Sequence, residues 1–299
     1  MRKLFFTIFA LGLLAPALQA DTVDAKASYL WSNRINQGIA SFTVKPSMLT
    51  EIGVAGRYVK DRNDYAYGRF KDPIYSVYLP MRLELELLDV ELTPFYYFEN
   101  DSAENASYQK ASGYGATFAL TVLMEDDQVN DVYTHARVGA AYAKQDGTLF
   151  KNNAAGENTS YAQAAYFLHL RQSLFQAYRF DVMGAAFQYP DGIKDVNAFR
   201  GVMNQQDLVS LQTLDVTRDL RKYSVGGRFT RTWQDKPSAL YFGYSFTENY
   251  TADPDHSFLL GNSFLIVKNV YVDMAYNHLE TSGHKNKRDV FYVSANFSF

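Results

Sequence analysis

Apolar and polar residues alternate with a period of two along most of the chain. The segment 74–87 shows this most clearly: its apolar positions are Tyr75, Val77, Leu79, Met81, Leu83, Leu85 and Leu87, and between them lie Ser76, Tyr78, Pro80, Arg82, Glu84 and Glu86. A strand places alternate positions on opposite faces, whereas an α-helix would scatter the apolar residues around its circumference. The same alternation returns at 110–124, 130–143, 238–248 and 289–299. The chain is therefore predicted to be one all-β domain.

Three further features favour a membrane-spanning β-barrel over a soluble sandwich. Many predicted strands have ten or more residues, which suits a tilted crossing of the hydrocarbon layer. Aromatic residues gather near predicted strand ends, as interfacial girdles require; these are Tyr29, Trp31, Tyr96, Phe98, Tyr142, Tyr189, Trp233 and Tyr276. Short connections near 46–50, 88–90, 126–129, 174–177, 235–238 and 267–269 alternate with longer ones, as the turns and loops of bacterial barrels do.

The pattern predicts a transmembrane antiparallel up-and-down β-barrel of about 14 strands, within a range of about 12–16. The strands are expected near 25–34, 38–46, 50–61, 74–88, 90–99, 110–125, 130–144, 159–173, 177–189, 222–234, 238–250, 256–267, 269–281 and 288–299. This count requires 190–221 to be one long excursion carrying a helix or a short hairpin. Its segment 208–216 also has the pattern of a strand, but a full crossing there would put the later short turns on the wrong side. Pro80 and Pro94 fall inside predicted strands, and each is expected to mark a bulge.

The first 20 residues have the pattern of a signal peptide. Basic Arg2 and Lys3 precede an apolar run over 4–14, and a small residue, Ala20, comes before Asp21. The alternative, a permanent anchor, is disfavoured because the run is shorter than the roughly 20 apolar residues of a membrane helix. We therefore expect a signal peptide at 1–20 and the barrel at 21–299. The net charge of −3 becomes −5 without Arg2 and Lys3, which does not indicate a nucleic-acid partner.

The last strand carries a pattern of its own. Phe291, Val293, Ala295, Phe297 and Phe299 alternate with four polar or aromatic residues, and the sequence stops on Phe299. This pattern resembles the terminal-strand signature of bacterial outer-membrane proteins. The resemblance implies a Gram-negative outer membrane, with lipid and lipopolysaccharide around the barrel, and recognition by the barrel-assembly machinery through Phe291, Phe297 and Phe299. In size and strand number the chain resembles the monomeric porin class of about 14 strands, which implies a monomer.

If the apolar face of each strand meets lipid, the opposite face lines the lumen. The charged and histidine positions expected there are Arg57, Arg82, Glu84, Glu86, Glu91, His135, Arg137, His169, Arg171 and Arg228. Four of the arginines lie six or seven residues from their predicted short turns, so they are expected to share one tier; these are Arg57, Arg82, Arg137 and Arg228. Such a ring can select ions and solutes. The alternative is a salt-bridge lattice, completed by Glu84, Glu86 and Glu91, that stiffens or closes the barrel.

These features lead to three ranked hypotheses. The first is a passive channel for small hydrophilic solutes, and the second is a closed barrel with a structural, adhesion or assembly role. The third is a membrane-embedded hydrolase; it is disfavoured because no serine stands at a recognisable spacing from His135 or His169. We expect no enzyme activity and no cofactor. A transition-metal site is not expected either, since the chain has no cysteine and only five scattered histidines.

Overall fold

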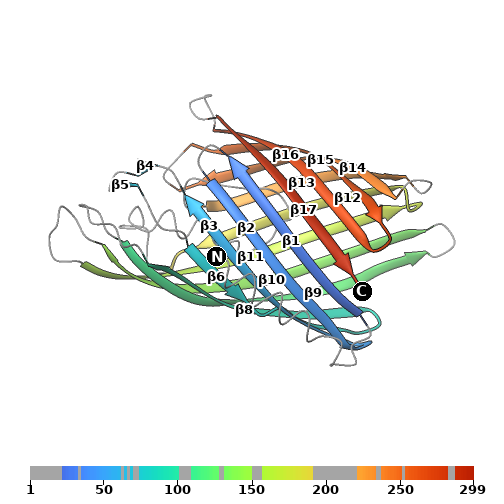
Figure 1. The fold of residues 1–299 in the computed structure, drawn as a ribbon, viewed down its shortest axis with the longest axis horizontal. Helices are drawn as coiled ribbons and strands as arrows, with labels where there is room; N and C mark the ends of the chain where they lie inside the picture. The colour runs from blue at the N-terminus through green and yellow to red at the C-terminus, as the bar shows by residue number, and fades with distance from the viewer. Residues whose placement is uncertain are drawn as a thin grey trace.

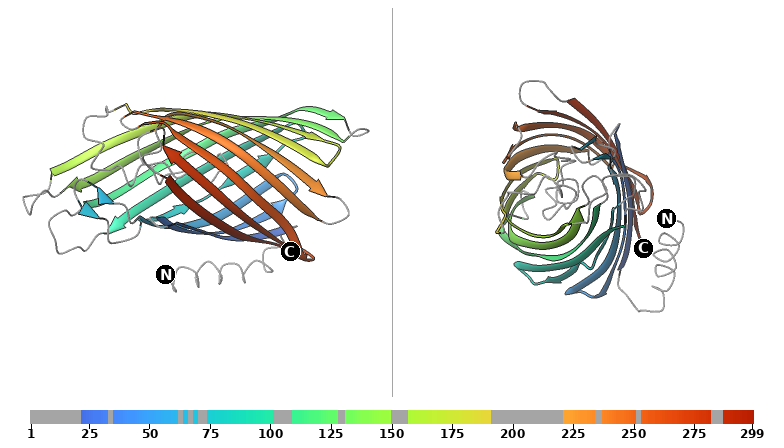
Figure 2. Two further views of the ribbon diagram at one scale, coloured as in Figure 1. Left: turned by 90° about the horizontal axis from the view of Figure 1, so that it is seen from above. Right: turned by 90° about the vertical axis from the view of Figure 1, so that its left-hand side faces the viewer.

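The computed structural model describes residues 22–32, 35–61, 64–65, 68–69, 74–100, 109–127, 131–149, 157–190, 221–233, 237–250, 253–281 and 287–299. These residues form a closed antiparallel barrel of 14 crossings, which confirms the predicted fold and strand number (Figures 1 and 2). No helix among the described residues is both long enough and apolar enough to cross a membrane. The predicted signal peptide at 1–20 and most of the predicted excursion, 191–220, lie outside the described residues.

The strands follow one another around the wall in chain order (Figure 1). Their bounds are β1 (Thr22–Ser32), β2 (Ile35–Ser47), β3 (Thr50–Asp61), β6 (Ile74–Tyr78), β7 (Met81–Glu84), β8 (Leu88–Asn100), β9 (Gln109–Asp127), β10 (Val132–Leu149), β11 (Glu157–Leu174), β12 (Tyr178–Gln188), β13 (Arg221–Trp233), β14 (Ser238–Asn249), β15 (Asp255–Val267), β16 (Val270–Thr281) and β17 (Lys287–Ser298). β6 and β7 together make one crossing. A separate two-residue pairing of β4 (Asp64–Tyr65) with β5 (Gly68–Arg69) lies between β3 and β6 in the chain.

The first and last strands close the barrel. β1 pairs antiparallel with β17, and Ser28 faces Ser294 in that ladder. At its end the backbone of Val23 exchanges two hydrogen bonds with that of Phe299, at 3.1 and 2.8 Å. Because β1 also pairs with β2, none of the strands in this ring keeps a free edge.

The short connections all lie at one end of the barrel, which we call the turn end; the opposite end is the loop end. They join β2 to β3, β7 to β8, β9 to β10, β11 to β12, β13 to β14 and β15 to β16. Four non-glycine residues with positive φ lie in these turns, as tight reversals require; they are Asp131, Phe175, Gln176 and Asn269. β12 is hydrogen-bonded directly to β13, so the count of 14 holds whatever path the chain takes between them.

Pro80 and Pro94 interrupt the hydrogen bonding without producing bulges, so that expectation was wrong. The pairing of β3 keeps the same register before and after Pro80, with Ala55 opposite Tyr78 and Ile52 opposite Met81. The Gly53 amide donates to the Pro80 carbonyl at 2.7 Å, and the Leu79 amide donates to the Pro94 carbonyl at 3.0 Å. Each proline therefore accepts one ladder bond and lacks only the return bond from its missing N–H. That loss divides the fourth crossing into β6 and β7.

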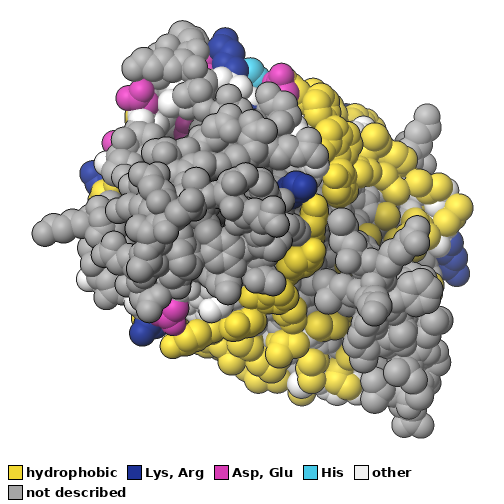
Figure 3. All heavy atoms as spheres, turned by 60° about the vertical axis from the view of Figure 1, so that its left-hand side comes forward, with side chains coloured by type: hydrophobic (Ala, Val, Ile, Leu, Met, Phe, Trp, Pro, Cys, Tyr) yellow, Lys and Arg dark blue, Asp and Glu magenta, His cyan; other side chains and the backbone are white. Residues whose placement is uncertain are grey.

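The outer surface is apolar, as the period-two pattern predicts. Val77, Leu79, Met81 and Leu83 are all exposed on the outer face of the fourth crossing, which consists of β6, β7 and the two residues between them. Figure 3 shows such hydrophobic side chains gathered over the outer wall. Toward the loop end, Trp31 stacks on Tyr29 and on Phe291, whose ring also contacts Tyr276. These rings form part of the aromatic girdle expected at a membrane interface.

Candidate functional site in the barrel interior

A belt of charged side chains occupies the inner face of the barrel near the turn end. We define the charged belt as Lys26, Lys45, Glu51, Arg82, Glu84, Asp89, Glu91, Arg137, His169, Arg171, Arg179, Asp181, Arg228 and Asp273. Each lies within five residues of the turn end of its strand. Along each strand these residues occupy the alternate positions to the exposed apolar residues, so their side chains point to the inner face. The belt divides into groups of contacts.

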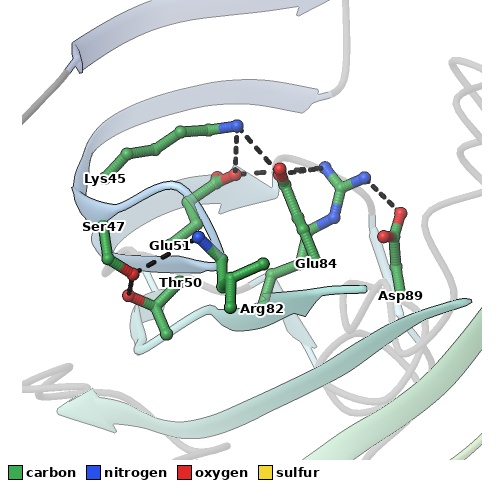
Figure 4. Close-up of polar contacts among 8 residues, drawn as sticks. Lys45, Ser47, Thr50, Glu51, Arg82, Glu84 and Asp89 are labelled. Carbon is green, nitrogen blue, oxygen red and sulfur yellow. Dashed lines mark hydrogen bonds and ion pairs between the residues drawn. The ribbon is translucent and has the colours of Figure 1, made fainter. Parts of the chain in front are cut away.

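The first group, the acidic network, joins β2, β3, β7 and β8 (Figure 4). Lys45 Nζ lies 2.8 Å from Glu84 Oε1 and 4.0 Å from Glu51 Oε2. Arg82 is paired with Asp89 and also lies 3.4 Å from Glu84 and 3.9 Å from Glu51. Two cations and three carboxylates give this network a formal charge of −1. The Arg82 side chain is 40% exposed, so water reaches the network.

A second contact spans a complete strand. Arg137 on β10 pairs with Glu91 on β8 at 2.7 Å, although β9 lies between them. Ala119 of β9 stands opposite Glu91 and is 1% exposed. Because this side chain is a single methyl group, the ion pair passes over it. The Arg137 guanidinium also lies 5.1 Å from the centre of the Phe167 ring, a cation–π distance.

The third group, the Asp181 cluster, lies on β11, β12 and β13. The Asp181 side chain is completely buried, and its Oδ1 lies 2.8 Å from both His169 Nε2 and Arg171 Nε. Its Oδ2 lies 3.0 Å from Arg228 Nη2 and 3.3 Å from Arg179 Nε. A buried carboxylate is tolerated when such partners compensate its desolvation. Three guanidiniums surround one carboxylate, so these four groups have a formal charge of +2.

Most of the lumen residues expected from sequence lie on the inner wall, but in separate groups. Arg82 joins Glu84, Arg137 joins Glu91, and Arg228 joins His169 and Arg171. Arg57 lies farther from the turn end, is 5% exposed, and donates to Gln37 Oε1 at 2.6 Å. The structure therefore does not bring the four predicted arginines together in one contact network. His135 stands opposite Arg171 in the ladder of β10 and β11.

Glu86 differs from its expected position. The sequence pattern places it on the inner face of one long strand, 74–88. The chain instead leaves β7 after Glu84, and the Leu85 amide donates to the Leu88 carbonyl at 2.9 Å. Glu86 is therefore an exposed residue of the turn, and no ion pair among the described residues includes it.

The central residue of the third group, Asp181, was missed by sequence reasoning, as was Arg179. Both alternate with the apolar residues Phe180 and Val182 within the predicted strand 177–189, so the period-two pattern already placed them on the inner face. The other members of the belt missed in this way are Lys26, Lys45, Glu51, Asp89 and Asp273. The contacts of Asp181 come from three strands, and only the barrel register brings those strands into line.

The inner face changes character toward the loop end. Leu30, Val59 and Val290 form a buried apolar cluster there. Asn277 is 0% exposed and accepts a hydrogen bond from Ser257 at 2.7 Å. By contrast, Lys26 of the charged belt is exposed. The described interior is therefore accessible near the turn end and closely packed near the loop end.

The three phenylalanines of the predicted assembly signal are exposed on the outer face: Phe291, Phe297 and Phe299. Phe299 has the most exposed side chain of the three, and its backbone is hydrogen-bonded to that of Val23. Within the described ranges, no group of three or more histidine or carboxylate side chains is placed to hold a metal ion.

No family model matches the chain, and no curated protein matches its sequence. Solved structures do match its fold. CdiB from Acinetobacter baumannii has a TM-score of 0.55 at 10% identity, over 93% of this chain and 60% of CdiB. CymD, described as a monoaromatic hydrocarbon channel, has a TM-score of 0.54 at 9% identity, over 93% of this chain and 88% of CymD. The chain has the outer-membrane β-barrel fold. This barrel spans about 60% of the length of CdiB, and the likeness concerns the fold, because the sequences share about one residue in ten.

Proposed function

We propose that this barrel is a passive channel for small hydrophilic solutes through the outer membrane of a Gram-negative bacterium. The observation that carries the proposal is the charged belt, several of whose members remain partly exposed inside the barrel. Arg82 is 40% exposed and Lys45 is 31% exposed. Charged groups away from water are costly, so these side chains favour a hydrated interior. Rings of charged side chains discriminate among ions and solutes that pass them.

The fold supports the same proposal. CymD is described as a channel, and it shares this architecture over 93% of the present chain. We do not extend the solute of CymD to this chain. The charged belt consists of ionised side chains, which would favour polar solutes over hydrocarbons.

Conductance in planar lipid bilayers tests the proposal. The refolded protein is first checked for the mobility change on heating that marks an intact barrel. It is then added to a bilayer in KCl, where we expect stepwise increases of current from single insertions. Protein that is folded and inserted but gives no steps would contradict the channel.

The second candidate, a closed barrel with a structural or adhesion role, is favoured by the packing near the loop end. Leu279 is 1% exposed and Val290 is 0% exposed. If these side chains narrow an open passage, replacing them with alanine should raise the single-channel conductance. If they seal the barrel, the wild type should be silent in the same assay.

A further inference from the structure

We infer that the Asp181 cluster binds small oxyanions, meaning the carboxylate or phosphate group of a solute. The inference deepens the proposed function and rests on it, because a solute reaches the cluster through the lumen. Its basis is the unequal number of charges: Arg171, Arg179 and Arg228 surround a single carboxylate. The cluster therefore has two positive charges more than its own members neutralise.

The nearest pair of charges on the β14–β16 side, Asp273 and Lys26, leaves this excess unchanged. Arg228 lies with its guanidinium 5.7 Å from the Tyr241 ring, and Tyr241 donates to Asp273 at 2.6 Å. Asp273 in turn interacts electrostatically with Lys26 as well as with Arg228. Adding one acidic and one basic group leaves the total unchanged. The acidic network on β2, β3, β7 and β8 has the opposite sign, so an anion in the lumen is drawn toward β11–β13.

Arg179 is the residue best placed to contact a ligand. Its side chain is 36% exposed, and among the described residues its ion-pair partner is Asp181, reached through Nε at 3.3 Å. The two terminal nitrogens of the guanidinium are not used in that contact. A planar guanidinium fork binds carboxylate and phosphate oxygens in a bidentate manner, with shorter and stronger bonds than neutral donors make.

Asp181 is a positioning residue for this site. Three arginines repel one another, and the buried carboxylate holds them together before any ligand arrives. His169 binds the same oxygen as Arg171, which fixes the orientation of the carboxylate. A prearranged site loses less side-chain entropy when the ligand binds.

The test measures binding and does not depend on current. The folded, detergent-solubilised protein is titrated calorimetrically with sodium phosphate and with disodium succinate, and with uncharged succinamide as the neutral comparison. We expect saturable binding of at least one of the two anions and none of succinamide. Phosphate and succinate together show which oxyanion the site prefers.

Arg179→Gln is the decisive variant, because Asp181 keeps its other three partners. We expect it to weaken anion binding about ten-fold, the loss that accompanies removal of a charge-assisted hydrogen bond. Arg231→Gln is the matched control: Arg231 lies on the outer face of β13 and donates to Tyr178 Oη at 2.9 Å. It removes the same charge outside the lumen, and binding should equal that of the wild type.

Three outcomes would overturn the inference. They are no saturable binding of either anion to the wild type, equal binding by Arg179→Gln and wild type, and succinamide binding as tight as that of succinate. A folded barrel that binds anions but carries no current contradicts the channel and leaves this site standing. A barrel that conducts without binding anions contradicts this site and leaves the channel standing.

Discussion

The ring of Tyr241 on β14 lies directly over Gly261 on β15, where a Cβ atom would come within 2.2 Å of Tyr241 Cζ. The Tyr241 hydroxyl passes across β15 and donates to Asp273 Oδ1 on β16 at 2.6 Å. Tyr97 on β8 repeats the arrangement over Gly113 on β9, and its hydroxyl donates to Gln145 on β10 at 3.0 Å. In both places a glycine leaves room for a side chain to link two strands that are not neighbours.

Gly261→Ala should destabilise the barrel. The added methyl group displaces the Tyr241 ring and breaks its bond to Asp273, and overpacking of this kind costs about 1–3 kcal/mol. Urea unfolding of the refolded protein in detergent measures the loss. Gly184→Ala is the control, since its Cβ would meet only the Ser224 carbonyl, at 3.9 Å. Equal unfolding midpoints for the two variants would show that the ring adapts without cost.

The closure of the barrel predicts a specific cross-link. Val23 and Phe299 form a hydrogen-bonded pair, so the alternate pair Ser28 and Ser294 is non-hydrogen-bonded. Such a pair has Cα atoms about 4.5 Å apart, within the range of a disulfide. Ser28→Cys with Ser294→Cys should therefore oxidise readily in a protein that has no cysteine of its own.

Mobility on non-reducing gels detects this disulfide. Ser28→Cys with Asn296→Cys is the control, because Asn296 faces Lys26 and is displaced by two residues from Ser28. Preferential cross-linking of the displaced pair would mean that β1 and β17 meet in another register.

The acidic network predicts opposite selectivity changes from two adjacent inner positions. Arg82→Ala removes one of its two cations and should shift selectivity toward cations. Glu84→Ala removes a carboxylate bound to both Lys45 and Arg82 and should shift it toward anions. One charge about 8 Å from a passing ion in water changes the energy of that ion by about 0.5 kcal/mol, with opposite signs for a cation and an anion. The permeability of each ion therefore changes about two-fold, and the cation-to-anion ratio about six-fold.

Reversal potentials across a KCl gradient measure both shifts. Lys268→Ala, in the exposed turn between β15 and β16, removes a charge at the same end of the barrel but outside the network. If Arg82→Ala and Glu84→Ala give the same potential as Lys268→Ala while the barrel inserts normally, the network does not line the conducting path.

The role of Phe299 in assembly remains a prediction with a direct test. Phe299→Asp keeps the two backbone bonds to Val23 but replaces an exposed apolar side chain at the turn end. We expect less heat-modifiable barrel in the outer-membrane fraction. Met48→Asp is the control, because Met48 is an exposed apolar residue in a turn at the same end. Equal yields of the two variants would exclude a special role for Phe299.

The local alternation of residues was enough to establish the wall of this barrel. Leu79 and Met81 face outward and Arg82 and Glu84 inward, as the period of two requires, because a slip of one residue would turn charges toward lipid. The same pattern established the strand number and the single end that holds the short turns. The pattern also placed Asp181 on the inner face, but this residue was overlooked among the apolar residues beside it.

Only the tertiary structure decided which charged residues meet. Position along each strand suggested one tier for Arg57, Arg82, Arg137 and Arg228, but distance from a turn does not fix contacts in a barrel whose strands tilt. Arg137 reaches Glu91 because the small Ala119 side chain, on the strand between them, leaves room for the contact. Arg228 reaches Asp181 because the two residues stand opposite each other in the ladder of β12 and β13. Such contacts depend on residues from two or three strands at once. The sequence of a single strand therefore specifies which face a charge occupies, and the register of its neighbours specifies its partner.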